Sequence, residues 1–184
     1  MLELITNIDD LDINLINDVL KIDSMVYPEH IQGTFDEVYD RFKANRDMLV
    51  LLCDGNKLIG YLCLFPIKEE LYDEIVNSDR MFDSDIPGEL LEQYEPYNTY
   101  TLYIISIAIL PEYHGKGLSN RLIEGFHKYI FEKKKNNIYF SAALSTAVTE
   151  GGEYILKKMG FKKRKILSEG YVLYELLIDD DYYN

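Results

Sequence analysis

Two glycines that flank a lysine form the segment best suited to hold a ligand, within residues 114–119 (HGKGLS). Glycine lets the main chain turn sharply, and because it has no Cβ a ligand can approach the backbone closely. Apolar residues at helical spacing follow, so the free N–H groups of this segment should lie at the positive end of a helix dipole. That position favours a phosphate or pyrophosphate. The sequence therefore predicts an anion-binding loop.

A strand before the loop and a helix after it would position these glycines. From Thr101 to Leu110 both alternating faces are largely apolar, which is typical of a strand buried in the centre of a sheet. Pro111 ends the strand, because proline has no N–H to donate to a neighbouring strand. The predicted helix is amphipathic, and its apolar positions are Leu118, Leu122, Ile123, Phe126 and Ile130.

This order of strand, proline, glycine loop and helix resembles the GNAT superfamily of acyl-CoA-dependent N-acyltransferases. Its signature is Arg/Gln-x-x-Gly-x-Gly/Ala, and the six positions are residues 114–119 here. His114 replaces the usual Arg or Gln, and Ser119 replaces Gly or Ala. Met159-Gly160-Phe161 stands at the distance that the family leads us to expect. A Walker phosphate loop does not fit, because Gly117 follows Gly-Lys where Ser or Thr is required.

The resemblance implies acetyl-CoA, or another short acyl-CoA, as cosubstrate. The backbone amides of Gly115 to Ser119 would hold its pyrophosphate, and the end of the central strand would hydrogen-bond its pantetheine arm. Lys116 would add a point charge. The cofactor-binding residues expected in this way are Ile107, Ala108, Ile109, His114, Gly115, Lys116, Gly117, Leu118 and Ser119.

The groups for proton transfer are less clear. Direct transfer to an amine needs a base for the ammonium proton and an acid for the departing thiolate. Many members of the family place a carboxylate three residues before the position of Ile109, which is Ser106 here. Many place a tyrosine four residues before the Gly-Phe pair, which is Leu156 here. Both positions depart from the family pattern.

Two catalytic candidates remain on these elements. Ser106 can orient a water molecule, although it is not a strong base. Tyr154 could act as the acid, but it lies two residues from position 156, about 200° around the helix. Glu92 and Glu95, just before the central strand, are alternative bases.

The charge of the chain is unevenly distributed. The formal net charge is −13, which argues against nonspecific nucleic-acid binding. Residues 1–98 contain 22 acidic and 7 basic side chains, whereas residues 112–170 contain 6 acidic and 12 basic ones. A polyanionic donor on the basic part and a cationic amine on the acidic part would suit this arrangement. Solvated helix faces would produce the same imbalance, so both interpretations stand.

Length and composition indicate one domain over residues 1–184. No stretch approaches the roughly 18 uninterrupted apolar residues of a membrane span, and the acidic N-terminus lacks the features of a signal peptide. We therefore expect a cytoplasmic protein that binds neither membranes nor nucleic acid, and a homodimer is compatible with the resemblance. No cluster of His, Cys and carboxylates has metal-ligand spacing, so no metal is expected. His30 and His127 are expected at the surface.

The order of elements matches that of the GNAT superfamily. The resemblance implies an α/β (α+β) fold with a mixed, mostly antiparallel central sheet, helices on its flanks and splayed central strands. Cys53 and Cys63 should lie in a hairpin around Gly55-Asn56, opposite Leu58 and Met48. Their sulfurs would then be too far apart for a disulfide. The remaining strands are expected at 2–5, 138–144, 161–166 and 171–178, and the helices at 15–27, 35–44 and 149–158.

Residues 68–98 interrupt this order with a strongly acidic segment. Short helices are expected at Lys68–Asn77 and Pro87–Gln93. The segment is longer than most connections in compact domains. The family builds part of its acceptor surface in this region, so the segment is interpreted either as a substrate lid or as a solvated acidic insertion.

Two hypotheses about function follow. In the first, the protein is an N-acetyltransferase that moves an acetyl group directly from acetyl-CoA to a primary amine, with a small cationic compound or a peptide amine as acceptor. In the second, it is an acyl-CoA-binding sensor of the same fold without turnover. The residues at positions 106 and 156 favour the second hypothesis, and the strand–loop–helix is common to both.

Overall fold

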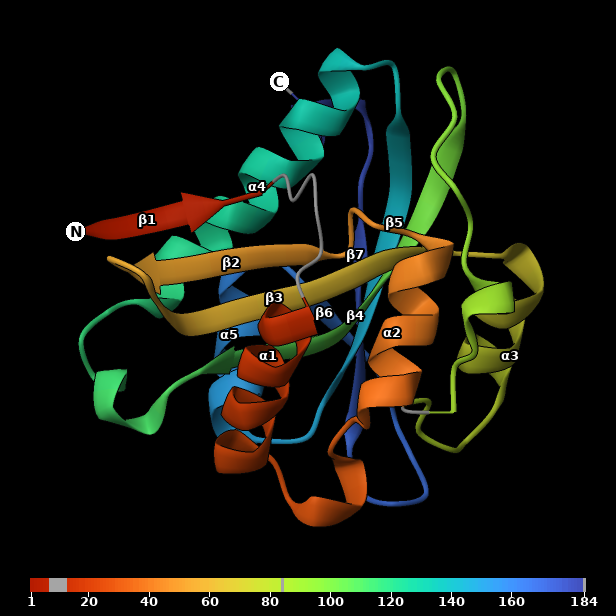
Figure 1. Ribbon diagram of the computed structural model, residues 1–184. Helices are drawn as coiled ribbons and strands as arrows, with labels where there is room; N and C mark the ends of the chain where they lie inside the picture. Colours follow the sequence, from red (N-terminus) through yellow and green to blue (C-terminus); the bar gives the residue numbers. More distant parts are fainter. Residues whose placement is uncertain (7–12, 84, 184) are drawn as a thin grey trace.

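A seven-stranded sheet with the strand order β1-β2-β3-β4-β5-β7-β6 forms the centre of the computed structural model (Figure 1), which describes residues 1–6, 13–83 and 85–183. The strands are β1 (Leu2–Ile5), β2 (Leu49–Asp54), β3 (Lys57–Ile67), β4 (Thr99–Ile109), β5 (Tyr139–Ala147), β6 (Lys162–Ile166) and β7 (Val172–Leu177). The helices are α1 (Ile13–Val26), α2 (Phe35–Ala44), α3 (Glu69–Asn77), α4 (Ser119–Lys135) and α5 (Glu150–Lys158).

The sheet is mixed but mostly antiparallel. Only β4 and β5 pair in parallel, and the strands on either side of them pair antiparallel. Helices α1 and α2 pack together against β3 and β4, while α4 and α5 lie on the opposite face (Figure 1). The predicted fold class is therefore confirmed. No helix in the described part of the chain is both long and apolar enough to cross the bilayer.

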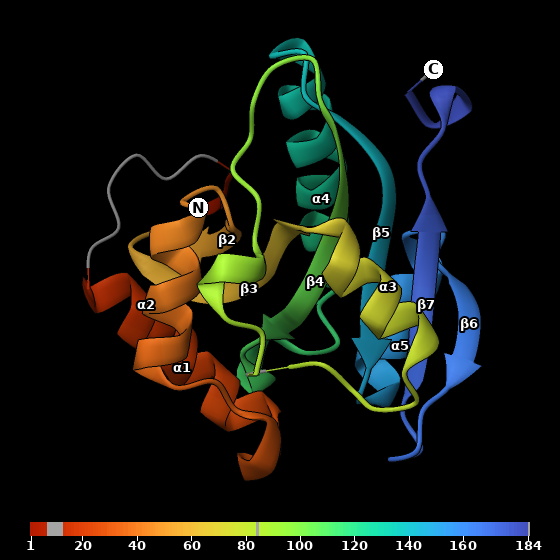
Figure 2. The same cartoon turned by 90° about the vertical axis from the view of Figure 1, so that its right-hand side faces the viewer.

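The two central strands separate halfway along β4. Their pairing ends at Ile104 and Ser145, whereas β4 stays paired with β3 as far as Ile109. Ser106 pairs with Cys63 and Ile104 with Leu64, which leaves Ile105 as an extra residue in β4. Such a bulge bends and twists a strand locally. The predicted splay is confirmed, and Figure 2 shows β4 and β5 diverging from the end at which they pair.

Local sequence signals define the helices that frame this region. Thr34 caps α2 through a reciprocal pair of hydrogen bonds with Glu37, as its capping-box pattern predicts. Helix α1 ends before Pro28, also as predicted. The side chain of Thr149 accepts a hydrogen bond from the N–H of Gly152 and caps α5. Short side-chain caps therefore set where these helices begin.

The register of the hairpin differs from the prediction by one residue. Cys53 pairs with Leu58 as expected, but Cys63 pairs with Leu49 and not with Met48. The cause is an irregularity between Leu52 and Cys53, which shifts the pairing of the rest of β2. Both cysteines are free thiols.

The acidic segment 68–98 is packed against the domain and is not a solvated insertion throughout. Leu71, Ile75 and Phe82 are all buried. Helix α3 agrees with the prediction, but the helix expected at Pro87–Gln93 is only a single 3-10 turn, η2 (Gly88–Leu90). The prediction was wrong because the chain turns there into extended backbone, where Leu91 forms a bridge with Ile67 of β3.

The loop after α3 is fixed by the hairpin of β6 and β7, more than eighty residues later. The Lys165 ammonium donates to the carbonyl oxygens of Val76 and Ser78. The lysine side chain thus caps the C-terminal end of α3. The N–H of Ser168 donates to the carbonyl of Asp79 at 2.7 Å, and the N–H of Met81 donates to the carboxylate of Glu169 at 3.1 Å. Residues 76–81 are thus attached mainly through their own main-chain atoms.

The close approach of β3 to β4 predicts the effect of a single methyl group. A Cβ at Gly60 would lie 2.9 Å from the carbonyl oxygen of Ala108, which is backbone and cannot rotate away. We expect Gly60→Ala to destabilise the protein by about 1–3 kcal/mol. Gly151→Ala is the matched control, because a Cβ in that position of α5 meets no atom within 4 Å. Thermal unfolding should give a lower midpoint for the first variant only, and equal midpoints would contradict the tight contact.

Candidate functional site

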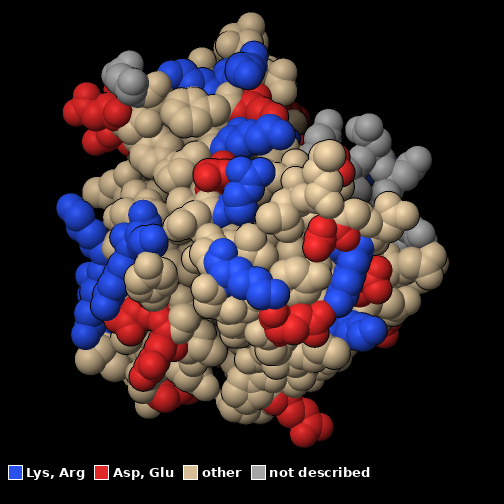
Figure 3. All heavy atoms as spheres, turned by 90° about the vertical axis from the view of Figure 1, so that its left-hand side faces the viewer, with Lys and Arg blue, Asp and Glu red and all other residues tan. Residues whose placement is uncertain are grey.

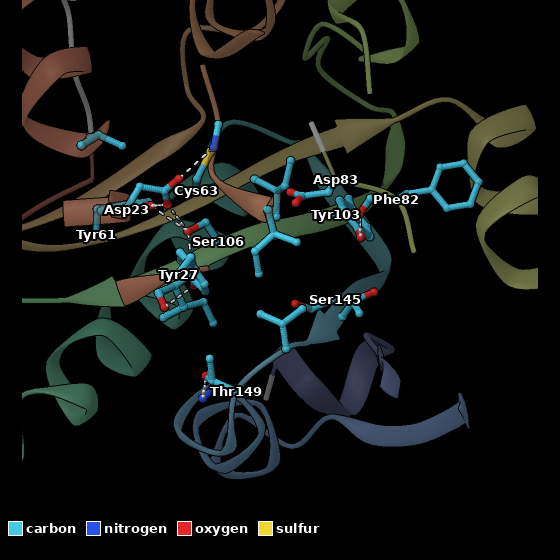
Figure 4. A pocket seen from close by; sticks show the side chains of 18 of the residues that line it. Asp23, Tyr27, Tyr61, Cys63, Phe82, Asp83, Tyr103, Ser106, Ser145 and Thr149 are labelled. Atoms are coloured by element: carbon cyan, nitrogen blue, oxygen red, sulfur yellow. Dashed lines mark hydrogen bonds between the residues drawn. The ribbon is translucent and has the colours of Figure 1, made fainter. Parts of the chain in front are cut away.

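A cavity opens where β4 and β5 separate. Its walls come from α1 and the middle of α2, from β3, from residues 81–83 after α3, from the facing parts of β4 and β5, and from α5. Its volume is about 70 Å³, which holds several water molecules. Most of the lining is apolar, and a few carboxyl and hydroxyl groups point into it (Figure 4). A largely apolar hollow with a few convergent polar groups is the usual form of a small-molecule site.

A cluster of hydroxyl groups surrounds one buried carboxylate at this cavity. The Tyr61 hydroxyl donates to Asp23 at 2.5 Å and lies 2.7 Å from the Ser106 hydroxyl. The Ser106 hydroxyl is 3.3 Å from the hydroxyl of Tyr27. Burial raises the pKa of the Asp23 carboxyl, although hydrogen bonds from Tyr61, the Gly33 N–H and Ser106 oppose that shift. Figure 4 shows these side chains as one connected group.

A second carboxylate, Asp83, reaches the same cavity from the loop after α3. Burial raises its pKa to about 7, against the opposing charge of Arg41. The negative charges of Asp23, Asp85 and Glu37 add to the increase. A carboxyl group that titrates near neutral pH can accept a proton as a base, and this property marks Asp83 as a functional candidate.

The glycine loop lies beyond the end of β4, between the 3-10 turn η3 (Pro111–Tyr113) and α4. Gly115 and Gly117 both have a φ of 73°, in the left-handed region that glycine adopts readily. A Cβ at either position would meet no atom within 4 Å, so the space in front of the loop is open. Among the described residues, none accepts a hydrogen bond from the main-chain N–H groups of residues 115–119. These donors at the start of α4 fit a pyrophosphate.

The other expected cofactor residues lie around this loop. Ile107, Ala108 and Ile109 form the buried end of β4, beyond its pairing with β5. Two side chains contact the main chain there: the Tyr27 hydroxyl donates to the Ile107 carbonyl at 2.8 Å, and His114 Nε2 lies 2.7 Å from the Ile109 carbonyl oxygen.

The remaining loop residues are partly exposed. The Lys116 ammonium lies 4.7 Å from the centre of the Tyr113 ring, in the geometry of a cation–π contact. Leu118 and Ser119, both half-buried, form the start of α4. Each residue of the expected loop therefore lies where the chain passes from β4 into α4.

The structure separates the two catalytic candidates from each other. Ser106 lines the cavity and belongs to the Asp23 cluster. Tyr154 is 54% exposed on the outer side of α5, and its ring lies under the Lys158 ammonium at 5.1 Å. Leu156, which is buried, faces the cavity from α5, as does Gly152. The reason is helix geometry, because two residues along a helix correspond to about 200° of rotation.

The alternative bases lie elsewhere. Neither Glu92 nor Glu95 lines the cavity, and both precede the end of β4 that is farthest from the glycine loop. The N–H of Glu92 donates to the carbonyl of Pro66 at 2.9 Å, which holds that stretch along β3. The structure does not bring these two carboxylates to the cavity.

The histidines outside the loop have contacts of their own. His30 is exposed as predicted, with Nε2 at 3.4 Å from the Tyr171 hydroxyl. His127 is half-buried instead of exposed: its Nδ1 lies 2.7 Å from the Tyr182 hydroxyl, and burial lowers its pKa. In residues 1–6, 13–83 and 85–183, no group of three or more His, Cys, Asp or Glu side chains is arranged to hold a metal ion.

Four polar residues of the cavity were missed by the sequence reasoning. Val19, Asp23 and Tyr27 follow one another at intervals of four, so an aspartate stands in the buried stripe of α1. That signal could have identified Asp23 and Tyr27. Tyr61 lies in the apolar strand β3, where a tyrosine is an ordinary core residue and gives no signal of function. Asp83 gave no signal, because nothing local distinguishes it from the other acids of residues 68–98.

The two sides of the site differ in charge. The carboxylates of the cavity come from α1 and from the acidic segment, whereas α5 and β6 carry the exposed cations Lys157, Lys158, Lys162, Lys163 and Arg164. Figure 3 shows the face that carries the start of α4, with Lys and Arg side chains gathered along one side and acidic side chains scattered among them. This distribution places positive charge near the loop and negative charge at the cavity.

Solved structures share the fold of this chain. The loading GNATL domain of CurA from Lyngbya majuscula has a TM-score of 0.66 at 16% identity, over 96% of this chain and 98% of that one. The PaiA N-acetyltransferase from Thermoplasma acidophilum, in complex with coenzyme A, has a TM-score of 0.59 at 13% identity, over 97% and 99%. The ribosomal-protein-S18-alanine N-acetyltransferase from Escherichia coli has a TM-score of 0.58 at 11% identity, over 97% and 95%. These likenesses show a common fold.

The sequence comparisons are more specific. No curated protein sequence matches this chain at a significant level. The profile of the acetyltransferase (GNAT) family, however, matches residues 16–150. This range contains most of α1, the glycine loop and most of the cavity, and it covers more than half of the 184 residues. The chain belongs to the acetyltransferase (GNAT) family.

Proposed function

We propose that the protein is an N-acetyltransferase that moves an acetyl group directly from acetyl-CoA to the primary amine of a small cationic acceptor. The observation that carries this proposal is the end of β4, where a strand edge left by β5 leads into an open glycine loop at the start of α4. When bound, acetyl-CoA supplies the acyl group as an activated thioester. Further support comes from a structural neighbour, the PaiA N-acetyltransferase, which was solved in complex with coenzyme A.

The donor is held by main-chain groups in this proposal. The N–H groups of Gly115 to Ser119 bind the pyrophosphate, and Lys116 adds a positive charge beside it. The main chain of Ile107 to Ile109 pairs with the pantetheine arm. His114 and Ser119 differ from the family signature, but their backbone donors do not depend on the side chain. Leu118 begins the first turn of α4 behind these donors.

The acceptor enters on the acidic side of the cavity. Asp23 and Asp83 attract an ammonium group there, in surroundings where burial strengthens the interaction. The narrow volume favours a primary amine at the end of an unbranched chain, as in a polyamine or an amino acid derivative. Apolar residues such as Val19, Ile31 and Ile105 would contact its hydrocarbon part.

Asp83 is the proposed base, and Ser106 a positioning residue. A base must accept the ammonium proton before the amine can attack, and a pKa of about 7 suits that task. Ser106 holds the amine or a water molecule through its hydroxyl group, which the Asp23 cluster orients. No proton transfer is assigned to Tyr154, because its ring lies on the outer side of α5.

The second hypothesis, an acyl-CoA sensor without turnover, is favoured by one specific observation. The family position for an acidic tyrosine is the buried Leu156, and no phenol takes its place on that side of α5. Free-thiol release from acetyl-CoA across a panel of primary amines distinguishes the two hypotheses. We expect turnover with at least one polyamine or amino acid derivative. Binding of acetyl-CoA without thiol release in any reaction would favour the sensor.

The glycine loop predicts a charge-specific loss of donor binding. Gly117→Asp places a negative charge in the open space in front of the loop, and we expect it to abolish acetyl-CoA binding in calorimetry. Gly117→Asn is the matched control: it has the same shape without the charge, and asparagine tolerates a positive φ better than most residues. It should retain much more affinity. Equal binding by both variants would show that the loop is not the phosphate site.

Asp83 predicts a pH dependence of catalysis. As the base it must be ionised, so kcat/KM should rise with pH and level off above about pH 7. Asp83→Asn should lower kcat/KM by about 100-fold or more and remove the rising limb. The control Asp73→Asn changes an exposed carboxylate of α3 and should keep the profile. An unchanged rising limb in Asp83→Asn would assign the titration to another group.

The same shift predicts an opposite effect on stability. Between the ordinary aspartate pKa of 3.8 and the folded value of about 7, the folded protein retains a proton that the unfolded chain has released. Stability therefore falls as pH rises through this window. Asp83→Asn removes this loss and should unfold at a higher temperature than the wild type at pH 8. A lower midpoint at pH 8 would contradict the raised pKa.

A further inference from the structure

The edge of β4 that faces the departed β5 is already hydrogen-bonded by side chains. The Tyr27 hydroxyl donates to the Ile107 carbonyl at 2.8 Å and accepts from the N–H of the same residue at 3.1 Å. Two residues along, the Ile109 carbonyl is contacted by His114 Nε2 at 2.7 Å. Both side chains reach a strand that has lost its partner after Ile104.

The direction of these main-chain groups follows from the pairing on the other edge. The N–H of Leu110 donates to the carbonyl of Ile59 at 2.8 Å, so Leu110 points toward β3. Along an antiparallel strand, successive residues point to alternate edges. Ile109 and Ile107 therefore point away from β3, toward the side that β5 has left. Their spacing of two residues is that of successive positions in a ladder of strand pairing.

At Ile107 one hydroxyl group makes both hydrogen bonds that a neighbouring strand would otherwise make. A partner strand would offer that residue one acceptor and one donor, and the Tyr27 hydroxyl offers both from a single atom. Buried main-chain polar groups are nearly always paired, because an unpaired one costs about as much as a lost hydrogen bond. Tyr27 thus satisfies the exposed ladder position in the absence of a ligand.

We propose that Tyr27 is a placeholder, which occupies in the free protein the main-chain groups of Ile107 that the pantetheine arm of acyl-CoA takes over on binding. The inference rests on the proposed function. The displaced hydroxyl would keep a partner, because it already accepts a hydrogen bond from the Ser106 hydroxyl at 3.3 Å. When the donor is present, Tyr27 would keep its contact with the cluster around Asp23 and lose its contacts with Ile107.

The placeholder weakens donor binding, because the ligand must first break the two bonds at Ile107. A contact that stabilises only the free state lowers the apparent affinity for the ligand, because a smaller fraction of the free protein is ready to bind. Tyr27 therefore acts as a positioning residue that sets the affinity for the arm. A residue that contacts the ligand directly would have the opposite effect when removed, so the sign of the change separates the two roles.

Calorimetry with CoA and Tyr27→Phe tests this inference. The variant lacks only the hydroxyl group, so we expect CoA to bind about 3- to 10-fold more tightly than to the wild type, the factor that one net hydrogen bond contributes. The free variant should unfold at a lower temperature, because Ile107 has lost its partner. Unchanged or weaker CoA binding by the variant would overturn the placeholder.

Two controls sharpen the test. Tyr100→Phe removes a hydroxyl that bonds the N–H of Glu95 and the carbonyl of Gln93 near the opposite end of β4, so it should lower stability and leave CoA binding unchanged. Adenosine 3′,5′-bisphosphate lacks the pantetheine arm, so its affinity should be equal for Tyr27→Phe and the wild type. A gain with this probe would contradict the inference. Absence of CoA binding by the wild type at high micromolar concentration would instead overturn the proposed function.

Discussion

The parting of β4 from β5 after Ile104 is the constraint on which the rest of the site depends. A central strand normally pairs along both edges, and the interior cannot leave its peptide groups without partners. The bulge at Ile105 turns β4 away and opens an edge inside the protein. The cavity, the contacts of Tyr27 and His114, and the position of the glycine loop all follow from that opening. The chain thus builds a place for an extended, amide-bearing ligand by withholding part of a strand.

Two carboxyl groups lie at this opening, and the loss of their hydration lowers the stability of the folded protein. Asp23 is buried and Asp83 half-buried, and burial raises the pKa of both, so the folded state disfavours their ionised forms. The hydroxyl groups around Asp23 offset part of that cost, and the nearby charge of Arg41 does so for Asp83. The positive charge of a bound ammonium group would stabilise the ionised forms of both carboxyl groups. The electrostatics of the two acids therefore favour a cationic acceptor.

The sequence predicted those features that local patterns encode. The glycine loop was found from its two glycines between a predicted strand and a predicted helix, and the end of β4 from Pro111. The predicted helix 35–44 is α2. The register of Cys63 was missed because a bulge depends on how two strands fit together, which no single strand reveals. The separation of β4 from β5 was expected only from the family resemblance, because the residue pattern of one strand does not show where it leaves its neighbour.

The proposed catalytic groups were harder to predict, because they depend on contacts between distant segments. Asp83 is one acid among many in its segment, and only the folding of that segment onto the β6–β7 hairpin brings it to the cavity. Tyr154 was considered for its chemistry, but the rotation of α5 turns it outward. Asp23 was visible in principle, since a charged residue within the apolar stripe of a helix signals a buried polar site. Residue type and spacing identify a loop within one segment more readily than a group of side chains that come together from distant segments.

The attachment of residues 76–81 to the β6–β7 hairpin has a consequence for how such a protein can diversify. All four hydrogen bonds use main-chain groups of this stretch, and none uses one of its side chains; the groups belong to Val76, Ser78, Asp79 and Met81. The backbone of that wall is held in position whatever side chains it displays. Substitutions of these side chains leave the four hydrogen bonds intact, and Met81 of this stretch lines the cavity. Under the proposed function, acceptor preference can therefore change between descendants of this sequence while the glycine loop beyond the end of β4 keeps its backbone.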